Sequence, residues 1–156
     1  MFSKVPTVAL MAVVIASVRV QAETHIVSFT NNCGYGTPYL WGPDGALYST
    51  GETVEFDGEA QGLIAYLQTG GCGNDGEGCT LVEATLINGA SSADISLIPP
   101  HEFSVTSGFG YYDGCDNTGA DCTYNGCPDA FYQPDQTWVQ VGCSADNVNL
   151  AITFCD

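Results

Sequence analysis

Hydrophobic and polar side chains alternate along several short segments of this chain. The clearest alternating segments are residues 25–30, 80–88 and 147–155. In residues 147–155, four apolar side chains fall on the same side of an extended chain: Val148, Leu150, Ile152 and Phe154. A period of two is typical of β-strands with one face against a core, so each segment is predicted to be a strand. No segment after residue 22 has the period of an amphipathic helix.

Shorter candidate strands lie between glycine-rich turns. They are residues 46–48, 53–56, 63–68, 93–98, 103–106 and 137–142. Pro43-Asp44-Gly45 is a typical turn, because proline presets φ, aspartate binds its own backbone and glycine accepts positive φ. A glycine-rich loop spans residues 72–79 and has a cysteine at each end. About ten short strands with such turns predict an all-β fold, an antiparallel β-sandwich, in one domain.

The first 22 residues have the features of an export signal. Lys4 precedes an apolar stretch over residues 8–18, and Val20-Gln21-Ala22 offers small residues for a signal peptidase. The apolar stretch is too short to span a membrane. We therefore expect a signal peptide at residues 1–22, a secreted protein, and a β-sandwich domain at residues 23–156.

Charge narrows the range of partners. The only Lys and Arg are Lys4 and Arg19, and all 18 acidic residues follow residue 22, so removing the signal changes the side-chain charge from −16 to −18. A domain with no Lys or Arg lacks the phosphate contacts that nucleic acids require, and anionic lipids repel it. We expect no nucleic-acid or membrane partner. The charge itself favours solubility and is compatible with a basic protein partner.

The cysteine count points to disulfide bonds. Eight cysteines follow residue 22: Cys33, Cys72, Cys79, Cys115, Cys122, Cys127, Cys143 and Cys155. An even number in an exported chain predicts four disulfides, although roughly a hundred pairings are open to eight cysteines. A zinc site is not expected, because histidines at ligand spacing are missing. The residues near 111–121 lack the register of a calcium loop, so no metal or cofactor is predicted.

Six segments, in order, resemble the thaumatin-like family, also called pathogenesis-related group 5. They are spread over most of the chain after residue 22, from residue 25 to residue 155, and include a first strand that ends in Asn-x-Cys and a C-terminal Thr-Phe-Cys. The six segments are HIVSFTNNC at 25–33, STGET at 49–53, TLVEATL at 80–86, ADISL at 93–97, CPDAF at 127–131 and ITFC at 152–155. The resemblance implies a β-sandwich fold.

The resemblance also implies a disulfide pattern. It pairs Cys33 with Cys155, Cys72 with Cys79, Cys115 with Cys143, and Cys122 with Cys127. Only four residues separate Cys122 from Cys127, where larger members carry a second domain. We therefore expect a small, fungal-type member that keeps the sandwich and lacks that domain.

In larger members an acidic cleft is lined by one arginine, one glutamate and three aspartates. Glu83, Asp94 and Asp129 match three of these five positions. Tyr66 stands where the arginine is expected, and Pro99 stands in place of the remaining aspartate. The resemblance thus implies a cleft that has lost its cation, one carboxylate and the wall formed by the second domain.

These residues suggest two kinds of saccharide chemistry. Glycoside hydrolysis needs an acid and a base or nucleophile, and Glu83 with Asp94 on neighbouring strands, supported by Asp129, are the candidates. They are equally compatible with ordinary solvent-facing carboxylates. Sugar binding without turnover uses aromatic rings that stack on apolar sugar faces, while carboxylates accept hydroxyl protons. The candidate binding rings are Trp41, Tyr66, Tyr111 and Tyr112, although large rings also commonly fill sandwich ends.

Three functional hypotheses follow. The first is a monomeric secreted protein that binds neutral polysaccharide such as cell-wall β-1,3-glucan, in a defence or wall-associated role without strong catalysis. The second is a weak endo-β-1,3-glucanase that uses the paired carboxylates. The third is a secreted effector or inhibitor that binds a protein partner through its acidic surface.

Overall fold

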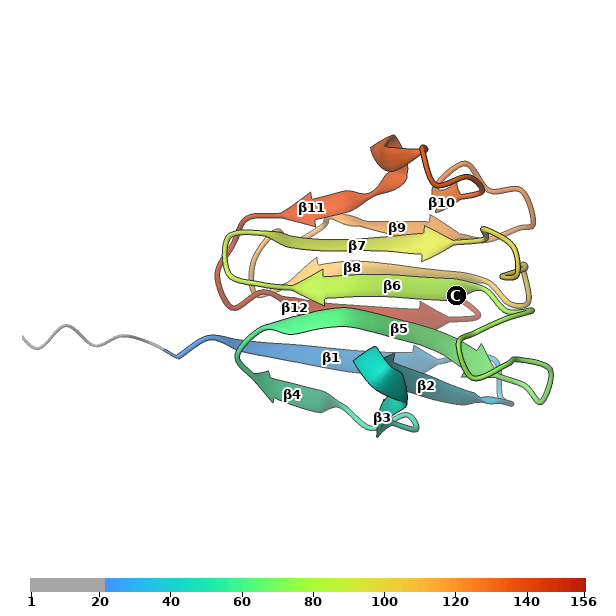
Figure 1. Cartoon of the computed structure of the whole chain (residues 1–156), viewed down its shortest axis with the longest axis horizontal. Helices are drawn as coiled ribbons and strands as arrows, with labels where there is room; N and C mark the ends of the chain where they lie inside the picture. The colour runs from blue at the N-terminus through green and yellow to red at the C-terminus, as the bar shows by residue number, and fades with distance from the viewer. Residues whose placement is uncertain (1–21) are drawn as a thin grey trace, which may run out of the picture.

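The computed structural model describes residues 22–156, and the predicted signal peptide lies outside the described residues except for Ala22. Strands of two β-sheets make up the domain (Figure 1). The first sheet has five strands, in the order β4 (Val54–Asp57), β1 (Thr24–Asn31), β12 (Asn149–Phe154), β8 (Ser107–Tyr112) and β9 (Gly119–Cys122).

The second sheet has seven strands. Their order is β10 (Ala130–Phe131), β7 (Ser91–Ser96), β6 (Leu81–Leu86), β5 (Ala60–Gln68), β2 (Thr37–Gly42) and β3 (Ala46–Ser49), and β11 (Val141–Cys143) also pairs with β7. The predicted proline turn forms a short 3-10 helix, η1 (Pro43–Gly45), between β2 and β3. A second 3-10 helix, η2 (Thr137–Val139), precedes β11.

The predicted all-β sandwich is confirmed, but its sheets are mixed, whereas antiparallel sheets were expected. β1 and β12 come from opposite ends of the chain, yet they lie side by side and run parallel, with Val27 opposite Leu150 (Figure 1). β10 is also parallel to β7. The physical reason is that alternation within one strand reports which side faces the core and carries no information on the direction of its neighbour.

The core lies between the sheets and confirms the predicted alternation. Val27 from β1 and the four side chains predicted to share one side near the C-terminus are at most 1% exposed. On the second sheet, Leu40, Ala65, Val82 and Ile95 join the same core cluster. Burial of these apolar groups provides the main favourable free energy of folding.

Some strand predictions differ from the structure. Residues 103–106 are not a strand, and β8 begins at Ser107 instead. Residues 137–142 divide into η2 and the start of β11. β2, β8, β9 and β10 were not predicted as strands. Proline, glycine and aromatic residues in β2 and β8 disguise the period of two, and a two-residue strand such as β10 is too short to show any period.

All four disulfides are paired as the resemblance implied. Cys33–Cys155, Cys72–Cys79, Cys115–Cys143 and Cys122–Cys127 form, and the described residues contain no free cysteine. The first of these joins residues 122 positions apart, at the adjacent ends of β1 and β12. Four disulfides fit an oxidising, extracellular environment. Within residues 22–156, no helix has the length and apolar character needed to cross a bilayer.

Candidate functional site

Four side chains form a row across the outer face of the seven-stranded sheet. Trp41 in β2 lies opposite Ile64 in β5, which lies opposite Glu83 in β6, which lies opposite Asp94 in β7. Their sequence neighbours point into the core, so all four point to the other face. We call these four residues the cross-strand row. It places an aromatic ring, an aliphatic side chain and two carboxyl groups on adjacent strands.

Two hollows meet at the acidic end of this row. One has a volume of about 290 Å³ and includes Ile64, Thr85 and Ser92 in its wall. The other has a volume of about 330 Å³ and includes Phe131 and Thr137. Both hollows are also lined by Glu83, Asp94 and Gln140. The carboxyl pair therefore borders both of them.

Asp94 is an unusual carboxyl group. Its side chain is 7% exposed, its Oδ1 atom has no hydrogen-bond partner among the described residues, and its Oδ2 atom accepts a 3.4 Å hydrogen bond from Gln140 Nε2. Burial first, and then the neighbouring Glu83 carboxylate, raise the pKa of Asp94 to about 7, whereas the bond from Gln140 opposes this shift. When Asp94 is protonated, it can donate a hydrogen bond to Glu83.

Tyr66 holds the aromatic end of the row in place. Trp41 Nε1 donates a 2.9 Å hydrogen bond to the Tyr66 hydroxyl, which donates a 3.0 Å bond to the carbonyl of Asn74. Tyr39 packs edge-on against Trp41, with ring centroids 6.0 Å apart. Trp41 is half-buried, but Tyr66 is fully buried, and this burial raises the pKa of its phenol. Tyr66 therefore cannot offer a ring face to a sugar, which corrects its predicted role as a binding ring.

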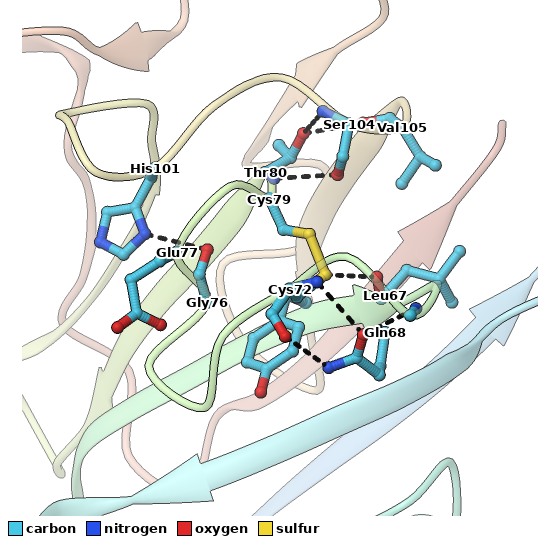
Figure 2. The surroundings of a disulfide bond; sticks show 12 residues. Leu67, Gln68, Cys72, Gly76, Glu77, Cys79, Thr80, His101, Ser104 and Val105 are labelled. Carbon is cyan, nitrogen blue, oxygen red and sulfur yellow. Dashed lines mark hydrogen bonds between the residues drawn. A yellow bond between two sulfur atoms is a disulfide. The ribbon is translucent and has the colours of Figure 1, made fainter.

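A disulfide loop (residues 72–79) covers Tyr66. Figure 2 shows the Cys72–Cys79 bond, with the Gln68 amide donating to the Cys72 carbonyl and accepting from the Cys72 backbone N–H. Gly76 has φ +79° and lies so close to Tyr66 and Leu81 that a Cβ atom there would be 2.5 Å from the Leu81 side chain. Glycine adopts a positive φ without strain, and it has no side chain that would displace Tyr66 or Leu81. The loop thus seals a second, smaller apolar cluster on the outer face.

The C-terminal side of the loop is anchored to the segment before β8. Thr80 and Ser104 exchange two hydrogen bonds between backbone N–H and side-chain hydroxyl, of 3.0 and 2.9 Å (Figure 2). His101 Nδ1 lies 3.1 Å from the carbonyl of Gly76. These contacts fix the loop relative to the sheet and so fix the surface on which Trp41 rests.

Three other predicted site residues lie away from the row. Tyr111 is 4% exposed, and its hydroxyl donates a 2.9 Å bond to the Val141 carbonyl, so its ring belongs to the core and its predicted binding role is wrong. Burial, and then the charge of Asp94, raise the pKa of Tyr111. Tyr112 lies in β8 of the other sheet, half-buried.

Asp129 is exposed and lines neither hollow at the carboxyl pair. Its charge acts instead on Asp121, whose pKa is raised by partial burial first and then by Asp156 and Asp129. The structure therefore brings Glu83 and Asp94 together and leaves Asp129 outside. No group of three potential metal ligands forms within residues 22–156.

Two residues of the site escaped sequence analysis. Ile64 occupies the row between Trp41 and Glu83, and Gln140 follows η2 and reaches Asp94 across 46 positions of sequence. Ile64 carried a detectable signal, because it alternates with the buried Leu63 and Ala65. Gln140 carried none, since it follows an irregular segment.

Comparison with known proteins gives structural similarity only. No protein-family model and no curated protein matches the chain. The solved structure of the thaumatin-like xylanase inhibitor TLXI aligns with a TM-score of 0.54 at 18% identity, covering 85% of this chain and 99% of that one. The protein elicitor MoHrip2 from Magnaporthe oryzae aligns with a TM-score of 0.51 at 18% identity, covering 86% of this chain and 100% of that one.

Proposed function

We propose that this chain, which has the fold of a small single-domain thaumatin-like protein, binds a wall polysaccharide such as β-1,3-glucan on the outer face of its seven-stranded sheet. The observation that carries the proposal is the cross-strand row, in which Trp41 and the Glu83–Asp94 pair lie on one face. We further propose that the protein is secreted, monomeric and wall-associated, with a role in defence.

The row combines the two contacts that a sugar needs. The apolar faces of Trp41 and Ile64 can stack on the axial C–H groups of a pyranose ring. The carboxylate of Glu83 and the Gln140 amide can bind sugar hydroxyls at the other end. The hollows on both sides of the carboxyl pair leave room for a chain that continues past one sugar unit.

A binding assay with matched variants tests this proposal. Trp41→Ala and Glu83→Gln should each reduce retention on insoluble β-1,3-glucan, whereas Trp138→Ala should not, although its ring is more exposed at 74%. Retention of the wild type on this glucan should also depend little on salt concentration, because the glucan is uncharged. Equal retention of all four proteins, or no retention of the wild type, would contradict the proposal.

One observation favours weak endo-β-1,3-glucanase activity as a second candidate. Retaining glycosidases need one protonated and one ionised carboxyl group about 5–5.5 Å apart. With its pKa raised to about 7, Asp94 can remain protonated beside Glu83. Against hydrolysis, a protonated Asp94 would donate its hydrogen bond to Glu83, and Tyr66 stands where the resemblance places an arginine. Release of reducing sugar by the wild type but not by an equally stable Glu83→Gln variant would establish the enzyme.

A protein partner is the third possibility. Residues 22–156 carry 18 acidic side chains and no Lys or Arg, so a basic protein would be attracted. One protein of similar fold is the thaumatin-like xylanase inhibitor TLXI. A complex of this kind should dissociate as salt rises, which separates it from binding of a neutral polysaccharide.

A further inference from the structure

The Glu83–Asp94 pair lacks an internal cation. The described residues contain no Lys or Arg, and the two histidines are engaged elsewhere. His25 is fully buried and lies 3.0 Å from Glu23, and His101 lies against Gly76 of the disulfide loop. Two carboxyl groups directly opposite each other on antiparallel strands repel when both are charged. The fold leaves this repulsion uncompensated.

The Oδ1 atom of Asp94 also lacks a hydrogen-bond donor. It is more than nine-tenths buried, it lines both hollows, and its only bond from the described residues is the long one from Gln140 to Oδ2. Buried polar atoms without a partner are rare in folded proteins and point to a ligand or a proton. A sugar hydroxyl can donate one hydrogen bond, but it brings no positive charge to the pair.

We propose that the Glu83–Asp94 pair recognises the ammonium group of an amino sugar, so that the preferred saccharide on this face contains glucosamine units. This inference rests on the proposed binding of a saccharide to the cross-strand row. An ammonium group offers three donors and one positive charge, and charge-assisted hydrogen bonds are about twice as strong as neutral ones. The overall charge of −18 after residue 22 also attracts a polycationic saccharide.

The same row favours a sugar over a lysine side chain as the source of the ammonium group. Trp41 and Ile64 continue the row away from the carboxyl pair, across two further strands. A flat ring that stacks there can belong to the next sugar unit of the same polymer. A lysine side chain would fill one hollow and leave the aromatic end of the row without a role.

The test is calorimetric titration with four ligands. They are a hexamer of glucosamine, its N-acetylated form, a β-1,3-glucan hexamer and a lysine hexapeptide. The glucosamine hexamer should bind about tenfold or more tightly than its acetylated form, because only the free amine is charged. Equal affinity for the two would overturn the inference and leave the proposed function standing, whereas no saccharide binding at all would overturn both.

Matched charge variants exclude general attraction. Glu83→Gln should lose the preference for the free amine, and Glu55→Gln should keep it, because Glu55 is an exposed residue of β4 in the other sheet. An equal loss in both variants would show a non-specific effect of charge and contradict the site. A lysine hexapeptide that binds as tightly as the glucosamine hexamer would replace the saccharide with a protein partner.

Proton release gives a readout that non-specific binding would not produce. An ammonium group that binds beside a protonated Asp94 favours its ionisation, so binding at pH 6 should release protons into the buffer. The enthalpy should then differ between two buffers of different ionisation enthalpy. The titratable groups acting on Asp94 are Glu83 from β6 and, from β8, Tyr111. Asp94→Asn should abolish the buffer dependence, and a wild-type enthalpy that is the same in both buffers would contradict the proposed contact.

Discussion

The two ends of the outer face of the seven-stranded sheet differ sharply. At the end near β2 and β5, the disulfide loop encloses Tyr66, Cys79 and Leu81, and the Tyr66 hydroxyl has a partner on each side. At the end near β6 and β7, Glu83 is only half-buried, and the buried Oδ1 atom of Asp94 has no hydrogen-bond partner within residues 22–156. One end is packed like a core, and the other is incomplete.

We infer from this difference that the packed end positions Trp41, whereas the incomplete end contacts the ligand. The packed end has its hydrogen bonds satisfied and can hold Trp41 in one orientation at no cost to a ligand, which is the benefit of preorganisation. The unpartnered Asp94 oxygen and the repulsion from Glu83 lower the stability of the free protein. That stability is regained only when a proton or a ligand binds. We therefore expect changes at the packed end to affect stability first, and changes at the incomplete end to affect binding and pH dependence.

The largest effect should come from opening the packed end. Replacing Cys72 and Cys79 by alanine should lower the free energy of unfolding by about 2–3 kcal/mol, the amount that the chain-entropy model gives for a short loop. In a Trp138→Phe background Trp41 is the sole tryptophan, and its emission should shift to the red as the loop loosens. Urea unfolding and fluorescence measure the two quantities.

Removal of Cys122–Cys127 is the control for this prediction. The two bonds join residues 7 and 5 positions apart, but Cys122 lies in β9 of the other sheet. A similar loss of stability without a red shift should result. A red shift of the same size in both variants would show that the disulfide loop has no special relation to Trp41.

A change at the incomplete end should raise stability, whereas opening the packed end lowers it, and the gain should depend on pH. In the folded state the pKa of Asp94 is raised from 3.8 to about 7, so the folded state binds more protons than the unfolded state and stability falls as pH rises through this range. Asp94→Asn removes that cost. It should increase the free energy of unfolding by about 1–3 kcal/mol at pH 8 and by little at pH 4.

Urea titrations of the wild type and Asp94→Asn at the two pH values measure this effect. Glu55→Gln serves as the comparison for loss of one exposed charge. A gain in the Asp94 variant that is the same at pH 4 and pH 8 would contradict the assigned pKa shift.

A smaller effect is expected at the link between the two ends. Tyr66→Phe keeps the ring in its cluster but removes the hydroxyl that joins Trp41 to Asn74. We expect a loss of about 1 kcal/mol in stability. Affinity for saccharide should also fall a few-fold, because Trp41 is no longer held in place. Unchanged affinity at reduced stability would show that Tyr66 acts only in packing.

The smallest effect is expected outside the row. Asp129→Asn should change stability by less than about 0.5 kcal/mol and leave saccharide binding unchanged, since Asp129 is exposed and lines neither hollow. A loss of binding as large as that of Glu83→Gln would place Asp129 in the site and extend the incomplete end toward β10.

Alternation and the family-like segments were sufficient to predict the sandwich, the disulfide pairing and the neighbouring strands of Glu83 and Asp94. They were insufficient at Tyr66, which alternates outward from the core like a surface residue yet is buried because a distant loop covers it. Tyr111 presented the opposite difficulty, because the glycines around it hide a core strand. Burial by a loop, and a contact such as that of Gln140, depend on tertiary structure that no local pattern encodes.

The bond between Cys33 and Cys155 has a mechanical consequence. If the domain is pulled from residues 23 and 156, the load passes along β1 and through this bond to the last two residues, and it bypasses the other strands. In this load path residues 23–33 have a fully extended length of about 40 Å, against about 450 Å for residues 23–156 when the disulfides are reduced. Under tension the oxidised domain would act as a short, nearly inextensible tether, and the seven-stranded sheet would stay outside the load path.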